Sequence, residues 1–238
     1  MRKINRILET EIINLILNFM IRFFSIITLS LVFCSAFGQL PSSLKTGSYK
    51  SLDDLLNNNP QYECNFQVSQ RSKFDIQMVA GNDFKVISDS KQIKKSEINS
   101  KTFAVFDGKN LYLNGNYING YKHYCLVENN QRYLILKAGV PKISKRKELG
   151  YSNSMIQVGS NPIGGFVGGA ATGAELAMVR LYYIVDCRTG IVKILSKDYL
   201  TSLLKDYSEL ESQFNLEEDS NNQTVLLDYL NRINEKQQ

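Results

Sequence analysis

The chain has 238 residues, 43% of them apolar, with a formal net charge of +5 at pH 7 and a single histidine. This length is enough for one well-buried core. The weak positive charge does not by itself indicate nucleic-acid binding, and one histidine excludes metal sites that need two imidazoles.

The N-terminal region contains an apolar run, Phe23–Phe37, that follows a single positive charge. Ala36 and Gly38 then stand at the −3 and −1 positions that signal peptidase selects. The pattern predicts a signal peptide over residues 1–38 and a mature, exported chain that begins at Gln39. Export would place the protein in the periplasm, at the outer membrane or outside the cell.

The start of translation, and two alternatives to a cleaved signal peptide, need separate treatment in this region. The segment before Met20 includes Glu9 and Glu11, and acidic side chains are unusual before a signal peptide, so we expect translation to start at Met20. An uncleaved anchor is one alternative, because residues 23–44 are uncharged and a spanning helix needs about 20 apolar residues. A lipoprotein signal ending at Cys34 is the other, although Phe33 is large for the position before a lipidated cysteine.

Removal of the predicted signal peptide takes away four basic and two acidic side chains, which leaves a net charge of +3. We therefore expect no nucleic-acid partner. The densest basic run consists of Lys142, Lys145, Arg146 and Lys147. We interpret it as a solvated loop, with contact to phosphate or lipid headgroups as the alternative.

Three cysteines remain in the mature chain: Cys64, Cys125 and Cys187. Disulfides are allowed in an exported protein, so one disulfide and one spare thiol form one interpretation. We expect three buried free thiols instead, because free cysteine behaves as a small apolar residue. No zinc or redox motif is present, and no cofactor is expected.

The first predicted elements are a turn from Gly47, a short helix and a series of strands. Ser51 is a plausible N-cap for one or two helical turns that end at residues 57–60. Period-two alternation then runs from Phe66 to about Ala138, beginning with Phe66 and Val68 and continuing with Phe74, Ile76 and Met78. Such alternation predicts half-buried strands.

Turn sequences separate these strands at short intervals, and they predict antiparallel hairpins. The turns contain Gly81-Asn82-Asp83, Asp107–Asn110, Asn114-Gly115-Asn116, Asn119-Gly120 and Glu128-Asn129-Asn130. The clearest hairpin joins residues 102–106 to 111–113, and the next joins residues 122–127 to 132–137. This meander favours an antiparallel sheet over a parallel nucleotide-binding sheet.

Strand character returns over residues 178–185 and 191–195, which are joined by a turn at Asp186–Gly190. Apolar stripes then predict three helices over residues 197–206, 208–215 and 224–234. The predicted fold class is α+β: a mainly antiparallel sheet, curved or barrel-like, with C-terminal helices from about residue 196. Residues 39–238 are expected to form one domain.

A glycine-rich segment of small residues interrupts this pattern, within an uncharged stretch between Glu148 and Glu175. Gly165, Gly169 and Gly173 stand four residues apart and would share one smooth face of a helix capped by Asn161-Pro162. We expect this face to be buried inside the domain. A homo-oligomer contact and a membrane contact are the alternatives, in that order, as in a glycine zipper.

No catalytic constellation is evident. His123 precedes Cys125 by two residues in a predicted strand, so the two would share a face, but this is a weak basis for a hydrolase. The acidic pairs Asp53-Asp54 and Glu217-Glu218 are typical of helix starts and linkers. The many tyrosines could line a pocket for an apolar ligand, although cross-strand packing is their commoner role.

Several short motifs resemble a family of uncharacterised exported proteins from Bacteroidetes-type bacteria. They are Gly47–Asp54 followed by Asn59-Pro60, Leu111–Asn114, Gly164–Gly173, Tyr183–Asp186 and Thr189-Gly190. The resemblance implies export and a domain of unknown function, and it brings no catalytic residues. We therefore expect a non-enzymatic envelope or interaction protein with an unknown envelope partner. A carrier of an apolar ligand and a hydrolase using His123 are the alternatives.

Overall fold

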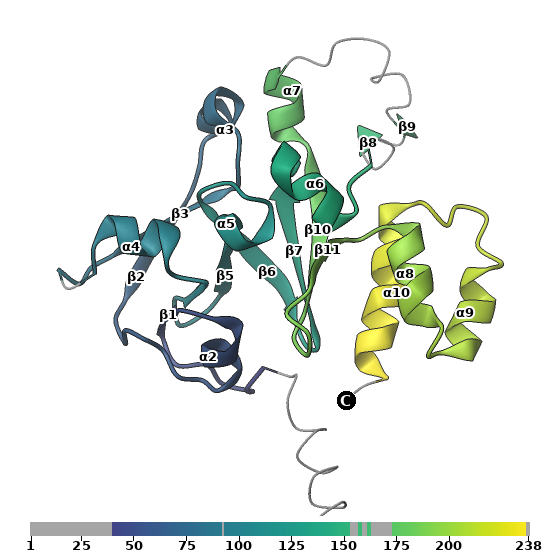
Figure 1. The fold of residues 1–238 in the computed structure, drawn as a ribbon, viewed down its shortest axis with the longest axis horizontal. Helices are drawn as coiled ribbons and strands as arrows, with labels where there is room; N and C mark the ends of the chain where they lie inside the picture. The colour runs from purple at the N-terminus through teal and green to yellow at the C-terminus, as the bar shows by residue number, and fades with distance from the viewer. Residues whose placement is uncertain (1–39, 92, 153–156, 159–160, 163–172, 237–238) are drawn as a thin grey trace, which may run out of the picture. The chain divides into compact units, whose positions relative to one another are not determined.

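The computed structural model describes residues 40–152 except 92, residues 157–158 and 161–162, and residues 173–236 (Figure 1). The predicted signal peptide with Ala36, Gly38 and Gln39 lies outside the described residues, as do Gly165 and Gly169. Among the described residues, no helix has both the length and the hydropathy needed to cross a bilayer.

Nine of the described strands form one antiparallel sheet. Its main order is β1 (Gly47–Tyr49), β4 (Ala104–Phe106), β5 (Leu111–Asn114), β6 (Tyr124–Asn130), β7 (Tyr133–Gly139), β10 (Arg180–Asp186) and β11 (Val192–Ile194). A branch is added by β2 (Phe66–Gln70) and β3 (Phe84–Ser88), because β3 pairs with both β2 and β6. The outer strands β1 and β11 do not pair in the described part of the chain, so the sheet is open.

Helices occupy the connections and the C-terminal part. They are α2 (Leu52–Leu56), α3 (Lys73–Val79), α4 (Lys95–Ser100), α5 (Gly115–Ile118), α6 (Ile143–Leu149), α7 (Gly173–Met178), α8 (Lys197–Leu204), α9 (Ser208–Phe214) and α10 (Gln223–Glu235). A separate two-stranded ladder joins β8 (Gln157–Val158) to β9 (Asn161–Pro162). The predicted antiparallel meander and the three C-terminal helices are confirmed.

The two faces of the sheet bury different clusters because side chains alternate along β7 and β10. Leu134, Leu136 and Tyr183 pack into one cluster with residues of α2, α5 and α6. Ile135 and Ile184 point into the opposite cluster, which α8, α9 and α10 cover (Figure 1). A third cluster lies between the β2–β3 branch and α4.

Four local predictions were wrong. Residues 73–79 form α3 and not a strand, because Ser72 caps a helix by accepting a hydrogen bond from the Asp75 backbone N–H. Two predicted turns are other elements: Asn114-Gly115-Asn116 is the N-cap and start of α5, and Glu128-Asn129-Asn130 is the end of β6. The turn predicted at Asn119-Gly120 is confirmed, with Gly120 at a φ of 85°. The basic run is not a loop: Lys142 is the N-cap of α6, and Lys145, Arg146 and Lys147 lie within the helix, with side chains half-buried or exposed.

The fourth wrong prediction is the helix start at Asn161-Pro162. These residues form β9, and a proline is tolerated in such a short ladder because it has few partners to lose. The pattern also missed β1, where it predicts a turn. Gly47–Tyr49 pairs with Ala104–Phe106, a partner so distant along the chain that no local pattern indicates it.

Candidate functional site

Helix α3 interrupts the β2–β3 hairpin and stands at the end of these two strands (Figure 1). The ladder ends with the pair Gln70–Phe84, and one further hydrogen bond joins the Arg71 backbone N–H to the Asp83 carbonyl over 2.7 Å. Ser72 then starts the helix by accepting from the Asp75 N–H at 3.0 Å. The end of the β2–β3 hairpin, at Arg71 and Asp83, therefore fixes the base of α3.

The outward side of α3 is apolar, which is unusual for a surface helix. Phe74, Met78 and Val79 are 69%, 68% and 65% exposed, and we call these three residues the α3 face. Phe74 and Met78 are four residues apart and so lie on the same side of the helix. Only Ile76 of α3 is buried, at 4% exposure.

Buried Arg71 holds the C-terminal end of α3. Its guanidinium donates at 2.8 Å to the backbone carbonyls of Asp75, Ala80 and Asn82. Carbonyls at a helix C-terminus lack partners within the helix, and a cation there also complements the helix dipole. Burial lowers the pKa of Arg71, while Asp75 and Asp83 oppose that shift.

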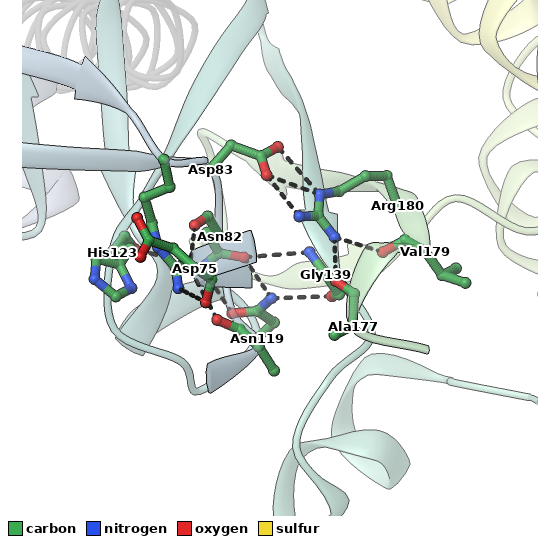
Figure 2. Close-up of polar contacts among 11 residues, drawn as sticks. Asp75, Asn82, Asp83, Asn119, His123, Gly139, Ala177, Val179 and Arg180 are labelled. Carbon is green, nitrogen blue, oxygen red and sulfur yellow. Dashed lines mark hydrogen bonds and ion pairs between the residues drawn. The ribbon is translucent and has the colours of Figure 1, made fainter. Parts of the chain in front are cut away.

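Asn82 and Asn119 form a reciprocal amide pair in the fully buried interior (Figure 2). Asn119 donates to the Asn82 side-chain oxygen at 2.7 Å, and Asn82 donates back at 3.1 Å. The same two side chains bond both backbone groups of Gly139, at the end of β7. A buried polar network that is satisfied in this way fixes one arrangement of its parts.

Two glycines make this packing possible. A Cβ atom on Gly115 would overlap the side-chain nitrogen of Asn82 and would lie 2.7 Å from the Tyr121 carbonyl. A Cβ atom on Gly139 would lie 3.1 Å from the carbonyl of Gly81. Glycine at positions 115 and 139 therefore lets separate segments approach at backbone distance.

An ion pair links the same region to α7 and β10. The Arg180 guanidinium donates to both carboxylate oxygens of Asp83, at distances of 2.6–3.1 Å (Figure 2). Its remaining nitrogen donates to the carbonyls of Ala177 and Val179 at 2.8 Å. The last turn of α7 is therefore anchored to the base of α3. We call Arg71, Asn82, Asp83, Asn119 and Arg180 the polar junction.

Two residues that bond to the polar junction have strained backbone. Ala80 has a φ of 52° and His123 a φ of 77°, although neither residue is a glycine. Such conformations cost roughly 1–3 kcal/mol each and persist where the surrounding contacts enforce them. Here Arg71 binds the Ala80 carbonyl, and Asn82 binds the His123 carbonyl at 3.4 Å.

His123 precedes β6 and does not lie within it, so the argument that placed it on one face with Cys125 fails. Cys125 is buried in the core. Burial, assisted by the nearby charges of Arg71 and Lys85, lowers the pKa of His123 to about 4. A base of that strength is a poor proton acceptor near pH 7.

The other predicted residues lie apart from the polar junction. The three cysteines among the described residues are free: Cys125 and Cys187 are buried as expected, whereas Cys64 is only half-buried. Burial raises the pKa of both buried thiols. Gly173 opens α7, where a Cβ atom would meet no described atom within 4 Å. The described residues contain no cluster suited to hold a metal ion.

One family model matches the chain over residues 47–237, and it is described as a family of unknown function (DUF6563). The chain belongs to DUF6563. The matched range begins at the first residue of β1 and includes α3, the polar junction and the C-terminal helices of this DUF6563 protein. No curated protein and no solved structure matches this chain. The predicted membership of a family of unknown function is confirmed.

Proposed function

We propose that this DUF6563 protein is an exported, non-enzymatic interaction protein of the cell envelope that docks through the α3 face. The observation that carries the proposal is the exposure of Phe74, Met78 and Val79 on one short helix. Apolar surface in contact with water costs roughly 25 cal/mol per Å². A partner that covers the α3 face removes this cost, which supports docking as its role.

The polar junction supports the same proposal because it orders the docking surface in advance. Arg71 fixes the end of α3, and the pair Asn82–Asn119 fixes the segment that follows it. A surface that is already ordered loses little conformational entropy on binding. Catalysis through His123 is the weaker alternative, since its pKa of about 4 makes it a poor base at neutral pH.

The test is fractionation of the native host with the double variant Phe74→Ser/Met78→Ser. We expect the wild-type protein in the envelope fraction, with an intact mass that begins at Gln39. The double variant should have the same processing and move to the soluble fraction. Both substitutions lie on exposed side chains, so their effect on folding should stay within about 0.5 kcal/mol each.

Leu216→Ser is the matched control, because Leu216 is 84% exposed but follows α9 in the C-terminal part. It should fractionate like the wild type. If the double variant also stays in the envelope fraction, the α3 face is not the docking surface. A wild-type protein that keeps the predicted signal peptide, or that remains in the cytoplasm, would contradict the exported part of the proposal.

A further inference from the structure

We propose that the partner of the α3 face is a membrane surface rich in anionic lipid headgroups. This inference rests on the proposed function, because it names the occupant of the same docking surface. The α3 face has exposed apolar side chains, and exposed lysines lie at the start of α3 and in the segments at its base. This combination matches the acyl layer and the headgroup layer of such a surface. The side chains enter the acyl boundary, and the lysines bind the headgroups.

The lysines belong to three segments that meet at the base of α3. A Cβ atom on Gly81, just after α3, would lie 3.3 Å from the Lys122 carbonyl and 3.4 Å from Cβ of Tyr121. The Lys142 ammonium lies 5.1 Å from the centre of the Tyr121 ring. The loop at residues 120–123 therefore contacts both the end of α3 and the start of α6.

We call Lys73, Lys122 and Lys142 the basic rim; all three are exposed. No acidic side chain in the described part of the chain forms an ion pair with any of them. Three acids of this region are already paired: Asp75 with Lys85, Asp83 with Arg180 and Glu148 with Lys145. Helix α7, which packs against α3, adds one exposed carboxylate, Glu175, which the three lysines of the basic rim outnumber. The surface around α3 therefore has an excess of positive charge, which attracts anionic lipid.

A lone apolar side chain at the start of α6 extends the pattern. Ile143 is 81% exposed and directly follows Lys142 of the basic rim. Apolar residues next to lysines are typical of segments that lie in a membrane interface. The N-terminal ends of α3 and α6 thus both offer an apolar side chain beside an exposed lysine.

Charge favours lipid over a second copy of the chain. A symmetric dimer through the α3 face would place one basic rim against another, and like charges across an interface are unfavourable. An anionic bilayer satisfies all three lysines at once. Binding should therefore weaken as added salt screens the lysines, which are exposed.

The chain contains no tryptophan, so a single tryptophan reports on one position. The variant Phe74→Trp, purified from the native host after any processing there, is mixed with vesicles of equimolar phosphatidylglycerol and phosphatidylcholine. We expect a blue shift of its emission with these vesicles and little with phosphatidylcholine alone. Leu216→Trp is the matched control and should not shift with either.

Adding Lys122→Gln and Lys142→Gln to Phe74→Trp should weaken apparent vesicle affinity by roughly fivefold per lysine. The control Lys147→Gln, on an exposed lysine of α6 outside the basic rim, should weaken it less. Emission from the tryptophan at position 74 that is unchanged by anionic vesicles, or shifted equally by neutral ones, overturns the lipid assignment. If the Phe74→Ser/Met78→Ser variant still leaves the envelope fraction of the host, docking stands and the partner is another molecule.

Sedimentation of the purified protein tests whether a second copy of the chain occupies the α3 face. Without lipid we expect a monomer at all concentrations tested. Dimerisation that Phe74→Ser/Met78→Ser abolishes would assign the α3 face to a second copy and overturn the lipid assignment. Unchanged thermal unfolding of each variant confirms that the differences arise from the surface and not from the fold.

Discussion

His123 shows how local structure sets the chemistry of one residue. Burial and the nearby cations Arg71 and Lys85 lower its pKa to about 4, from an ordinary value of 6.5, while a hydrogen bond with the Lys122 backbone and the charge of Asp75 oppose this shift. Between these two pH values the unfolded chain is protonated at His123 and the folded chain is not. The free energy of unfolding should therefore fall as pH drops from 6.5 to 4, and His123 should have no effect above that range.

The first prediction is that the imidazole titrates near pH 4 in the folded protein. Because the chain has a single histidine, its proton NMR signals are assigned without ambiguity. His123→Asn should flatten the pH dependence of unfolding between pH 6.5 and 4, since asparagine tolerates the left-handed backbone and does not titrate. A measured pKa near 6.5 would show that the His123 side chain is neither buried nor close to Arg71 and Lys85 in the folded protein.

Gly115 provides a second prediction at the residue scale. Gly115→Ala places a methyl group onto the side-chain nitrogen of Asn82, so the Asn82–Asn119 pair must separate. We expect a loss of about 3 kcal/mol in the free energy of unfolding, measured by urea denaturation.

Gly173→Ala is the control for this substitution, because a Cβ atom there meets no described atom within 4 Å. It should stabilise α7 slightly, by less than about 1 kcal/mol, as alanine is the better helix former. An equal loss in the free energy of unfolding for the two variants would mean that contact between the new methyl group and Asn82 is not the cause of the loss at Gly115.

The residues of the polar junction are hard to recognise in the sequence. Asn82 and Asn119 stand in segments that predict turns, and both are indeed next to turns or caps. Their pairing spans 37 positions along the chain, which local patterns cannot indicate. Arg71 and Arg180 look like ordinary surface cations until the fold places carbonyls around them.

At the scale of elements, α3 is the instructive case. Alternation at Phe74, Ile76 and Met78 predicts a strand, and the structure has a helix with Phe74 and Met78 outside and Ile76 inside. The sequence does contain a signal for the helix, since Ser72 and Asp75 have the spacing of a capping box. Period-two patterns over so short a segment cannot distinguish the two elements when the apolar residues face water.

Arg71 gives the prediction that belongs to this scale. Arg71→Met leaves the carbonyls of Asp75, Ala80 and Asn82 without their donor, and should lower the free energy of unfolding by about 2–4 kcal/mol. Hydrogen exchange should show that α3 loses protection before the rest of the sheet. Arg71→Lys should recover only part of the loss, because an ammonium cannot reproduce the planar fork.

Arg188→Met is the control, because Arg188 is exposed in the turn between β10 and β11. It should leave both stability and exchange unchanged. Should Arg71→Met leave the exchange of α3 unaltered, the helix must be held by contacts other than the guanidinium.

For the whole molecule, the sequence predicted the fold class and the local hairpins, because turn chemistry and alternation act over short distances. The pairing of β1 with β4 and of β7 with β10 joins distant segments and could be known only from the structure. The exposure of the α3 face could not be predicted from the sequence either, because exposure depends on how the whole chain folds. Family membership followed from short motifs and is shown over residues 47–237.

The central claim is that the α3 face is covered when the protein is in its envelope fraction. The most direct measurement is maleimide labelling of Met78→Cys and of the control Leu216→Cys, with wild-type labelling subtracted. In the purified protein both introduced cysteines should react. In the envelope fraction we expect the cysteine at position 216 to react and the one at position 78 to be protected, whereas equal labelling at both positions would contradict the account.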